Sequence, residues 1–125
     1  MKLSPSSAGN RQPSMSRRFP EILVDVAKLR DYCLNDAHPR GRHKARVFKS
    51  RLGLSAEDSE TLRKAVLEAA TDVHARFQES RADAYGQRYV LDFPLTNAVG
   101  SAVVRTTWIV RTHEDVLILT SCYVL

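Results

Sequence analysis

The spacing of hydrophobic positions changes about two-thirds of the way along the chain. From residue 42 to about residue 77, apolar residues recur every three or four positions, whereas from residue 89 they largely alternate with polar residues. A period near 3.6 is typical of amphipathic helices, and a period of two is typical of half-buried strands. The pattern therefore predicts helices first and strands afterwards.

The residues before position 54 predict an entry segment, a turn and a helix. The run Ile22–Val26 suits a strand or an extended entry after a proline, and Asp25 can cap a short helix that follows. Residues 35–41 form a turn by composition. Residues 42–52 predict a helix that Gly53 terminates, with a buried stripe of Ala45, Phe48 and Leu52.

A second long helix is predicted after residue 55. Ser55 is placed as its N-cap, with Asp58 as the capping-box partner. Its apolar face indicates a helix that runs to about His74 or Phe77. Residues 78–87 are polar and predict a loop.

The last part of the chain predicts three strands, over residues 89–95, 101–111 and 116–124, joined by short loops. Pro94 points to an edge position or a bulge. Strict alternation puts Leu119, Ser121 and Tyr123 on one face of the last strand. We therefore expect an α+β fold, with N-terminal helices packed on one face of a three- to four-stranded antiparallel meander.

Length and composition fit one ordinary globular domain. The 125 residues are 43% hydrophobic and 26% charged. Residues 1–20, rich in Ser, Pro, Arg and Asn, predict a disordered basic arm before a domain over residues 21–125. No run is long and apolar enough for a membrane helix, and no secretory signal is evident. Cys33 and Cys122 form no CxxC pair, so a cytoplasmic protein is expected.

The net charge of +5 is unevenly distributed. Residues 1–53 hold 12 Lys/Arg and 4 Asp/Glu (+8), whereas residues 54–125 hold 7 and 10 (−3). The segment Ala37–Arg51 has six Lys/Arg, two His and no acid. Such a cluster favours a polyanionic partner, although a solvated basic helix without a partner would have the same composition.

The residue pattern favours chemistry without a metal or a cofactor. The four histidines lack the spacing of a zinc site, and neither a phosphate-binding glycine loop nor a dinucleotide motif occurs. The segment 38–44 instead places His38, His43 and Lys44 at a helix start, where backbone amides also attract anions. Imidazoles and cations suit metal-free RNA cleavage, but the same residues could simply shape a turn.

Residues 28–48 resemble a bacterial family of unknown function with the pattern K-L-x-x-Y-x-L-N-x-x-H-P-x-G-x-x-K-A-x-x-F. Residues 85–89, 104–110 and 119–123 match its later blocks. The order of elements and the closing W-I-V … L-T-S-C-Y blocks are similar to the barnase/EndoU/colicin/RelE-like (BECR) superfamily of metal-independent ribonucleases, which occur as toxins. The resemblance implies a site of His38, Lys44, Arg105, Ser121 and Tyr123, with His43 and Thr120 as neighbours. Our candidate catalytic set is therefore these residues other than Thr120, and our candidate phosphate or RNA contacts are Thr120 and the cations Arg40, Arg42 and Arg46 of the basic segment.

Two functional hypotheses follow from these observations. The first is a metal-independent endoribonuclease that acts on RNA, the toxin of a toxin–antitoxin or related conflict system with an acidic antitoxin or immunity protein as partner. The second is a non-catalytic basic module that binds nucleic acid or an acidic protein through residues 37–51. Neither hypothesis involves a membrane or a small-molecule cofactor.

Overall fold

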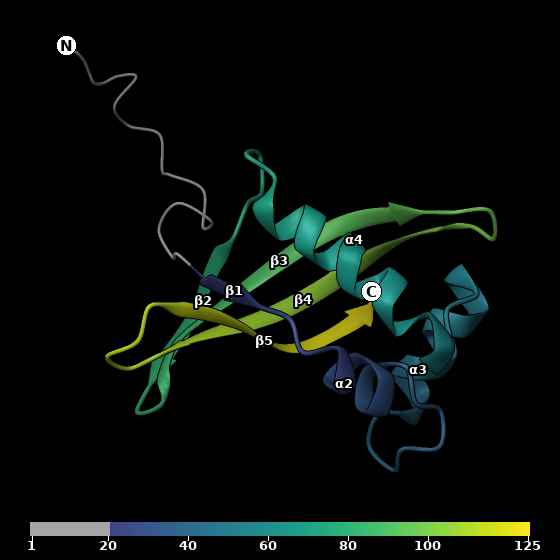
Figure 1. The fold of residues 1–125 in the computed structure, drawn as a ribbon, viewed down its shortest axis with the longest axis horizontal. Coiled ribbons are helices and arrows are strands. Elements are labelled where there is room, and N and C mark those ends of the chain that lie inside the picture. The colour runs from purple at the N-terminus through teal and green to yellow at the C-terminus, as the bar shows by residue number, and fades with distance from the viewer. Residues whose placement is uncertain (1–20) are drawn as a thin grey trace.

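The computed structural model describes residues 21–125, and in it helices cover one face of a five-stranded sheet (Figure 1). The strand order is β1-β5-β4-β3-β2, with bounds β1 (Glu21–Leu23), β2 (Gln78–Asp83), β3 (Gly86–Thr96), β4 (Ser101–Arg111) and β5 (Val116–Val124). Strands β2 to β5 form an antiparallel meander, and β1 pairs in parallel with β5. The predicted α+β class is confirmed, but the sheet has five strands and is mixed. The predicted arm lies outside the described residues.

The helical half follows the predicted order. It contains α2 (Val26–Lys28), the π-helical turn η1 (Leu29–Cys33), α3 (Arg42–Leu52), the 3-10 turn η2 (Ala56–Asp58) and α4 (Ser59–Thr71). Asp25 accepts a hydrogen bond from the Ala27 amide at 2.9 Å, and Gly53 ends α3 with a φ of 67°. Ser55 and Asp58 form the predicted capping box. Local capping signals therefore placed these helix ends correctly.

Helix α4 ends earlier than the apolar pattern predicted. It stops at Thr71, because Asp72 has an extended backbone and its carboxylate accepts a hydrogen bond from the His74 amide at 2.7 Å. Phe77 is still part of the core without being helical. Its ring makes an edge contact with Trp108 at 5.8 Å between centroids.

The core lies between the helices and the sheet. Leu62, Val66 and Ala70 of α4 and Phe48 of α3 are fully buried there, as is Trp108 of β4. Two polar side chains inside the core form a chain of hydrogen bonds. The Trp108 indole N–H donates to the Thr106 hydroxyl at 2.8 Å, and that hydroxyl donates to the Leu91 carbonyl at 2.7 Å. Their desolvation is thereby compensated.

Strand β2 replaces the loop that the sequence predicted over residues 78–87. All six side chains of β2 are exposed, so no hydrophobic alternation marks the strand. Backbone pairing with β3, from Gln78 opposite Val90 to Asp83 opposite Gly86, holds it in place. A strand stabilised mainly by its ladder leaves no periodic signal in the sequence.

A bulge in β5 overturns the predicted alternation of that strand. Thr107 lies opposite Ser121, and the next residue, Trp108, lies opposite Leu119, so Thr120 is the extra residue. Leu119 and Cys122 are consequently both buried. Leu119 does not share a face with Ser121 and Tyr123, as strict alternation had indicated.

Pro94 occupies a free edge, one of the two positions predicted for it. Strand β2 pairs with β3 only as far as Val90, which leaves Leu91–Thr96 without an outer strand among residues 21–125. Val103 bonds through its carbonyl to Leu125 on the β5 side, so its pair with Pro94 is not hydrogen-bonded and the proline nitrogen faces the outer edge. A proline there costs no ladder hydrogen bond.

Candidate functional site

The face of the sheet opposite the helices is polar at its centre, and we call it the open face. Alternation along β4 puts Arg105 and Thr107 on this face, whereas Val104, Thr106 and Trp108 point into the core. Their neighbours on β3 and β5, assigned from the strand register and the bulge, are Val90, Asp92, Thr120, Ser121 and Tyr123. The open face therefore collects several of the residues singled out in the sequence.

One row of this face crosses three strands. Asp92 on β3 lies opposite Arg105 on β4, which in turn lies opposite Tyr123 on β5. The Arg105 guanidinium donates two hydrogen bonds to the Asp92 carboxylate, each 2.8 Å long. Asp92 raises the pKa of Arg105 most, with a smaller contribution from the nearby Tyr123 hydroxyl. The guanidinium is thus charged and fixed in orientation.

Helix α3 adds a second cation to this row. The Lys44 ammonium nitrogen lies 4.1 Å from the centre of the Tyr123 ring, in a cation–π contact. Lys44 flanks the buried stripe of α3, one turn before Phe48 and next to Ala45, and its side chain is exposed. Tyr123 is consequently in contact with two cationic side chains from different elements.

Hydroxyl groups form the next row. The hydroxyls of Thr107 and Thr120 are 2.7 Å apart, and Ser121 pairs directly with Thr107. The bulge causes this grouping, because it brings two consecutive hydroxyl residues of β5 opposite a single residue of β4. Together with Tyr123 they give the open face hydrogen-bonding groups that can contact phosphate oxygens.

His38 stabilises the turn before α3. Its Nδ1 atom accepts hydrogen bonds from the backbone amides of Arg40 and Gly41, at 3.0 and 3.1 Å. Its ring also contacts the Tyr32 ring edge-on, with centroids 4.7 Å apart. Gly41 fits beneath this turn because a Cβ atom there would lie 2.7 Å from the Tyr32 carbonyl oxygen. These contacts explain the histidine and the glycine of the sequence motif as parts of one turn.

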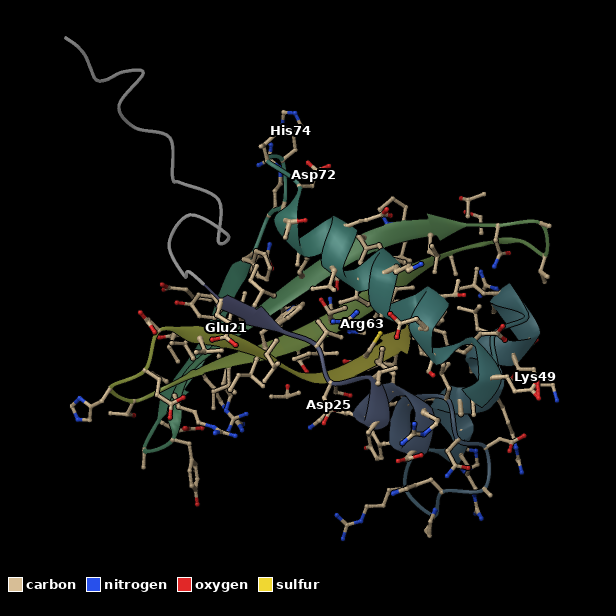
Figure 2. All side chains as sticks on the ribbon, in the orientation of Figure 1. Glu21, Asp25, Lys49, Arg63, Asp72 and His74 are labelled. Atoms are coloured by element: carbon tan, nitrogen blue, oxygen red, sulfur yellow. The ribbon has the colours of Figure 1, made fainter. Side chains whose placement is uncertain are left out.

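The remaining predicted residues are spread over the outside of α3 and the turn before it. Arg40, Arg42, His43 and Arg46 are exposed, and Lys49 projects from the outer side of the helix (Figure 2). None of the ion pairs found within residues 21–125 involves a residue of α3. These cations form an unneutralised basic surface on α3 and the turn before it, and among the α3 cations of residues 21–125 only Lys44 is found on the Tyr123 ring.

The two cysteines meet in the core although they are distant in sequence. Cys33 of η1 and Cys122 of β5 are both buried, and the backbone amide of Cys122 interacts with the Cys33 thiol. Burial raises the pKa of both thiols, so they stay protonated and unreactive. They act as small hydrophobic residues.

Metal sites and membrane-spanning helices are absent from the described part of the chain. Within residues 21–125, no group of three or more His, Cys, Asp or Glu side chains could hold a metal ion. In the same range, no helix is long and apolar enough to span a membrane.

The chain belongs to a family defined by a domain of unknown function, DUF6883, whose model matches residues 17–125. The unknown-domain resemblance seen in the sequence is thereby confirmed. No curated protein and no solved structure matches the chain.

Sequence reasoning missed one residue of the central row. Asp92 is a single acid in a strand, and only its position opposite Arg105 gives it significance. The available signal was the arginine itself, since an arginine at the centre of a sheet requires an acid, water or a phosphate as its partner. The strand register, which the sequence does not give, was needed to identify Asp92 as that partner.

Proposed function

We propose that this protein is a metal-independent endoribonuclease of the cytoplasm, and that it is the toxin of a toxin–antitoxin or related conflict system. The observation that carries the proposal is the convergence of Lys44, Arg105 and Tyr123 on the open face. The order of helices followed by the meander β2 to β5 also resembles the BECR ribonucleases. An acidic antitoxin would be the natural partner of so basic a surface.

The proposed reaction is an internal transesterification of RNA. The 2′-hydroxyl oxygen attacks phosphorus, and the bond from phosphorus to the 5′ oxygen breaks. One proton leaves the 2′-hydroxyl and one is added to the departing 5′ oxygen, so no net proton is consumed. The products are a 2′,3′-cyclic phosphate and a 5′-hydroxyl. Catalysis needs stabilisation of the negative charge on the non-bridging oxygens of the phosphorane and two proton transfers.

The geometry suggests a role for each group. Lys44 supplies a positive charge beside Tyr123, where the charge of the phosphorane would develop. Arg105, which is ion-paired with Asp92, offers its remaining N–H donors to the phosphate. The Tyr123 hydroxyl donates a proton or hydrogen bond to the leaving oxygen. Thr120 and Ser121 orient a non-bridging phosphate oxygen.

We assign the base to His43 by elimination, because it is the other imidazole of the motif and is exposed on α3; within residues 21–125 only Lys44 of α3 is found on the Tyr123 ring. His38 is less suited to proton transfer than its position in the motif suggested, because its Nδ1 atom already accepts two amides. We assign it to positioning the first turn of α3 and thereby Lys44.

The direct test is cleavage of single-stranded RNA in EDTA, followed by analysis of the product ends. The proposal expects a 2′,3′-cyclic phosphate and a loss of kcat/KM of about 100-fold in Lys44→Ala, the size typical for one charge-stabilising group. Lys49→Ala is the matched control, because Lys49 is also an exposed lysine of α3 but does not contact Tyr123. Growth arrest on expression should likewise disappear with Lys44→Ala and persist with Lys49→Ala.

RNA that stays intact with the wild-type protein across neutral pH would refute the ribonuclease. Cleavage that is abolished by EDTA and restored by a divalent metal would refute its metal independence.

A second candidate function has its own support in the unpaired cations of α3. A non-catalytic module would bind nucleic acid or an acidic protein through Arg42, Arg46 and Lys49, which have no ion-pair partner within residues 21–125. It predicts affinity that falls steeply with salt and no cleavage. Reversal of Arg42 and Arg46 to Glu should remove that binding without unfolding the protein, since both side chains are exposed.

A further inference from the structure

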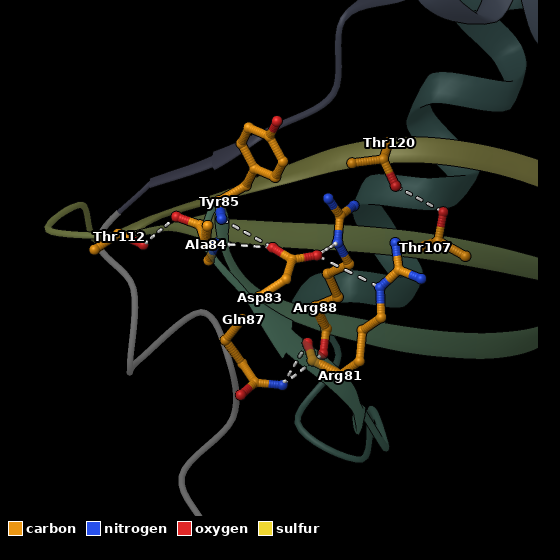
Figure 3. Close-up of polar contacts among 10 residues, drawn as sticks. Arg81, Asp83, Ala84, Tyr85, Gln87, Arg88, Thr107, Thr112 and Thr120 are labelled. Carbon is orange, nitrogen blue, oxygen red and sulfur yellow. Dashed lines mark hydrogen bonds and ion pairs between the residues drawn. The ribbon is translucent and has the colours of Figure 1, made fainter.

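A second cationic cluster lies at the other end of the open face, where the β2–β3 hairpin begins. Arg88 Nε lies 3.0 Å from Asp83 Oδ2, and Arg81 Nε lies 3.5 Å from the same oxygen. Figure 3 shows both guanidinium groups turned toward this one carboxylate. The amides of Tyr85 and Gly86 also donate to Asp83. The acid is therefore shared by two arginines and leaves an excess of positive charge.

Arg111 adds a third arginine to this corner. It lies opposite Gly86, and the alternation along β4 puts it on the same face as Arg105 and Thr107. Gly86 carries no side chain that could cover it, and a Cβ atom there would lie 2.1 Å from the Val110 carbonyl oxygen. Arg111 is exposed and has no ion pair within the described part of the chain.

The charge of this corner is a consequence of the fold. Residues 54–125 carry a net charge of −3, yet three of their arginines come to this corner. Arg81 and Arg88 lie beside Asp83, and Arg111 lies opposite Gly86, which on its other side pairs with Asp83. A structural role in fastening the hairpin explains the Arg88–Asp83 pair. It does not explain why two further arginines face the same side of the sheet: Arg81, which shares the Asp83 carboxylate with Arg88, and Arg111.

Hydroxyl groups connect this corner with the central row. Thr107 and Thr120 lie between Arg88 and Arg105 along the strands, and Figure 3 shows them on the same face as the arginine cluster. Asp92 and Arg88 are four residues apart on β3, a separation of about 14 Å at about 3.4 Å per residue. A single phosphate group cannot contact both ends of the face.

We propose that Arg81, Arg88 and Arg111 form a second phosphate-binding subsite, so that a single RNA strand lies across the open face along β4. The inference rests on the proposed function for its ligand. The scissile phosphate would lie at Arg105 and Tyr123, and a backbone phosphate farther along the strand would lie at the hairpin. The strand must be unpaired, because the 2′-hydroxyl of an A-form duplex is not in line with the bond to be broken.

The test compares Arg111→Gln with Lys64→Gln, a control on α4 at the opposite side of the sheet. With an oligonucleotide of about ten nucleotides, within the range of single-strand binding sites, Arg111→Gln should raise KM by about tenfold and leave kcat unchanged. A dinucleotide substrate, too short to reach the hairpin, should be cleaved equally well by both variants. Arg88→Gln is the second variant, with its thermal unfolding measured because the change also breaks an ion pair.

Binding is measured separately on Lys44→Ala protein, so that this arm does not depend on cleavage. The slope of log affinity against log salt concentration is negative. Removal of one phosphate contact should make it less steep, by about 0.7 for a single strand. Oligonucleotides with and without a 5′-phosphate distinguish a backbone phosphate from an end phosphate. The proposal expects Arg111→Gln to weaken the binding of both kinds of oligonucleotide equally.

The outcomes separate the two proposals. If Arg111→Gln makes the salt dependence of binding less steep and the wild-type protein cleaves no RNA, the subsite is supported and the ribonuclease is refuted. Cleavage with unchanged KM and salt slope in both Arg111→Gln and Arg88→Gln refutes the subsite and leaves the ribonuclease standing. An effect confined to 5′-phosphorylated strands overturns the backbone assignment.

Discussion

The Lys44 ammonium nitrogen lies 4.1 Å from the centre of the Tyr123 ring, although the two residues come from different halves of the chain. A contact of this kind at an exposed site stabilises by about 0.5–1 kcal/mol. Its larger consequence is positional, because it places a charge from α3 over the last strand. Arg105 approaches the same tyrosine from β4.

Tyr123→Phe should separate the two features of this tyrosine. The variant keeps the ring over which Lys44 lies and removes the hydroxyl, so the fold and the lysine position should be retained. If the hydroxyl transfers a proton, kcat should fall by about 100-fold or more. Tyr85→Phe, at an exposed hairpin tyrosine, should cleave RNA as the wild type does. Equal activity of both variants would exclude Tyr123 as the acid.

The Asp92–Arg105 pair should contribute to acid sensitivity. Hydrogen bonding from Arg105 holds the pKa of Asp92 below its ordinary value. A carboxylate with a lowered folded-state pKa stabilises the protein above the unfolded-state pKa, and this contribution is lost as pH falls through the folded-state value. We therefore expect the Tm of the wild type to decline below about pH 4, and the decline to be shallower in Asp92→Asn.

The size of that effect is limited because both side chains are about one-third exposed. An ion pair this exposed to solvent contributes little to the free energy of unfolding. Thermal unfolding between neutral and acidic pH measures it. If the Tm of the wild type and of Asp92→Asn declines equally as the pH is lowered, the prediction is contradicted.

Substitution of His38 should affect stability more than chemistry. His38→Ala removes an acceptor shared by two backbone amides and should lower the free energy of unfolding by about 1–2 kcal/mol. His38→Asn, which keeps a short acceptor, should recover part of that loss. Denaturant unfolding measures both. If folded His38→Asn cleaves no RNA, the imidazole has a catalytic role after all.

Pro94 should protect the free edge of β3. Its nitrogen faces outward where β2 no longer pairs, so Pro94→Thr would create a new outward N–H. Edge strands with free donors and acceptors template pairing between copies. Light scattering should show concentration-dependent association of Pro94→Thr under conditions where the wild type does not associate. A variant that stays in the wild-type state at every concentration would show that the edge needs no such protection.

Local signals in the sequence carried a large part of the fold. The apolar stripe of Ala45 and Phe48, the terminating glycine Gly53 and the capping box at Ser55 each act within a few residues, so helix positions followed directly from them. The end of α4 was missed because the Asp72 turn interrupts a pattern that stays apolar to Phe77. Strand β2 was missed because every one of its side chains is exposed.

The sequence by itself determined the helix-then-strand order, the basic character of α3 and the turn that His38 builds, because those depend on neighbours along the chain. Tertiary structure alone decided that Asp92, Arg105, Tyr123 and Lys44 share a row. A strand register cannot be read from one strand, and the bulge at Thr120 changes which side chains face the solvent. The physical reason is that backbone pairing between distant strands determines which side chains lie next to one another on the open face. The periodicity of side chains within one strand does not specify that pairing.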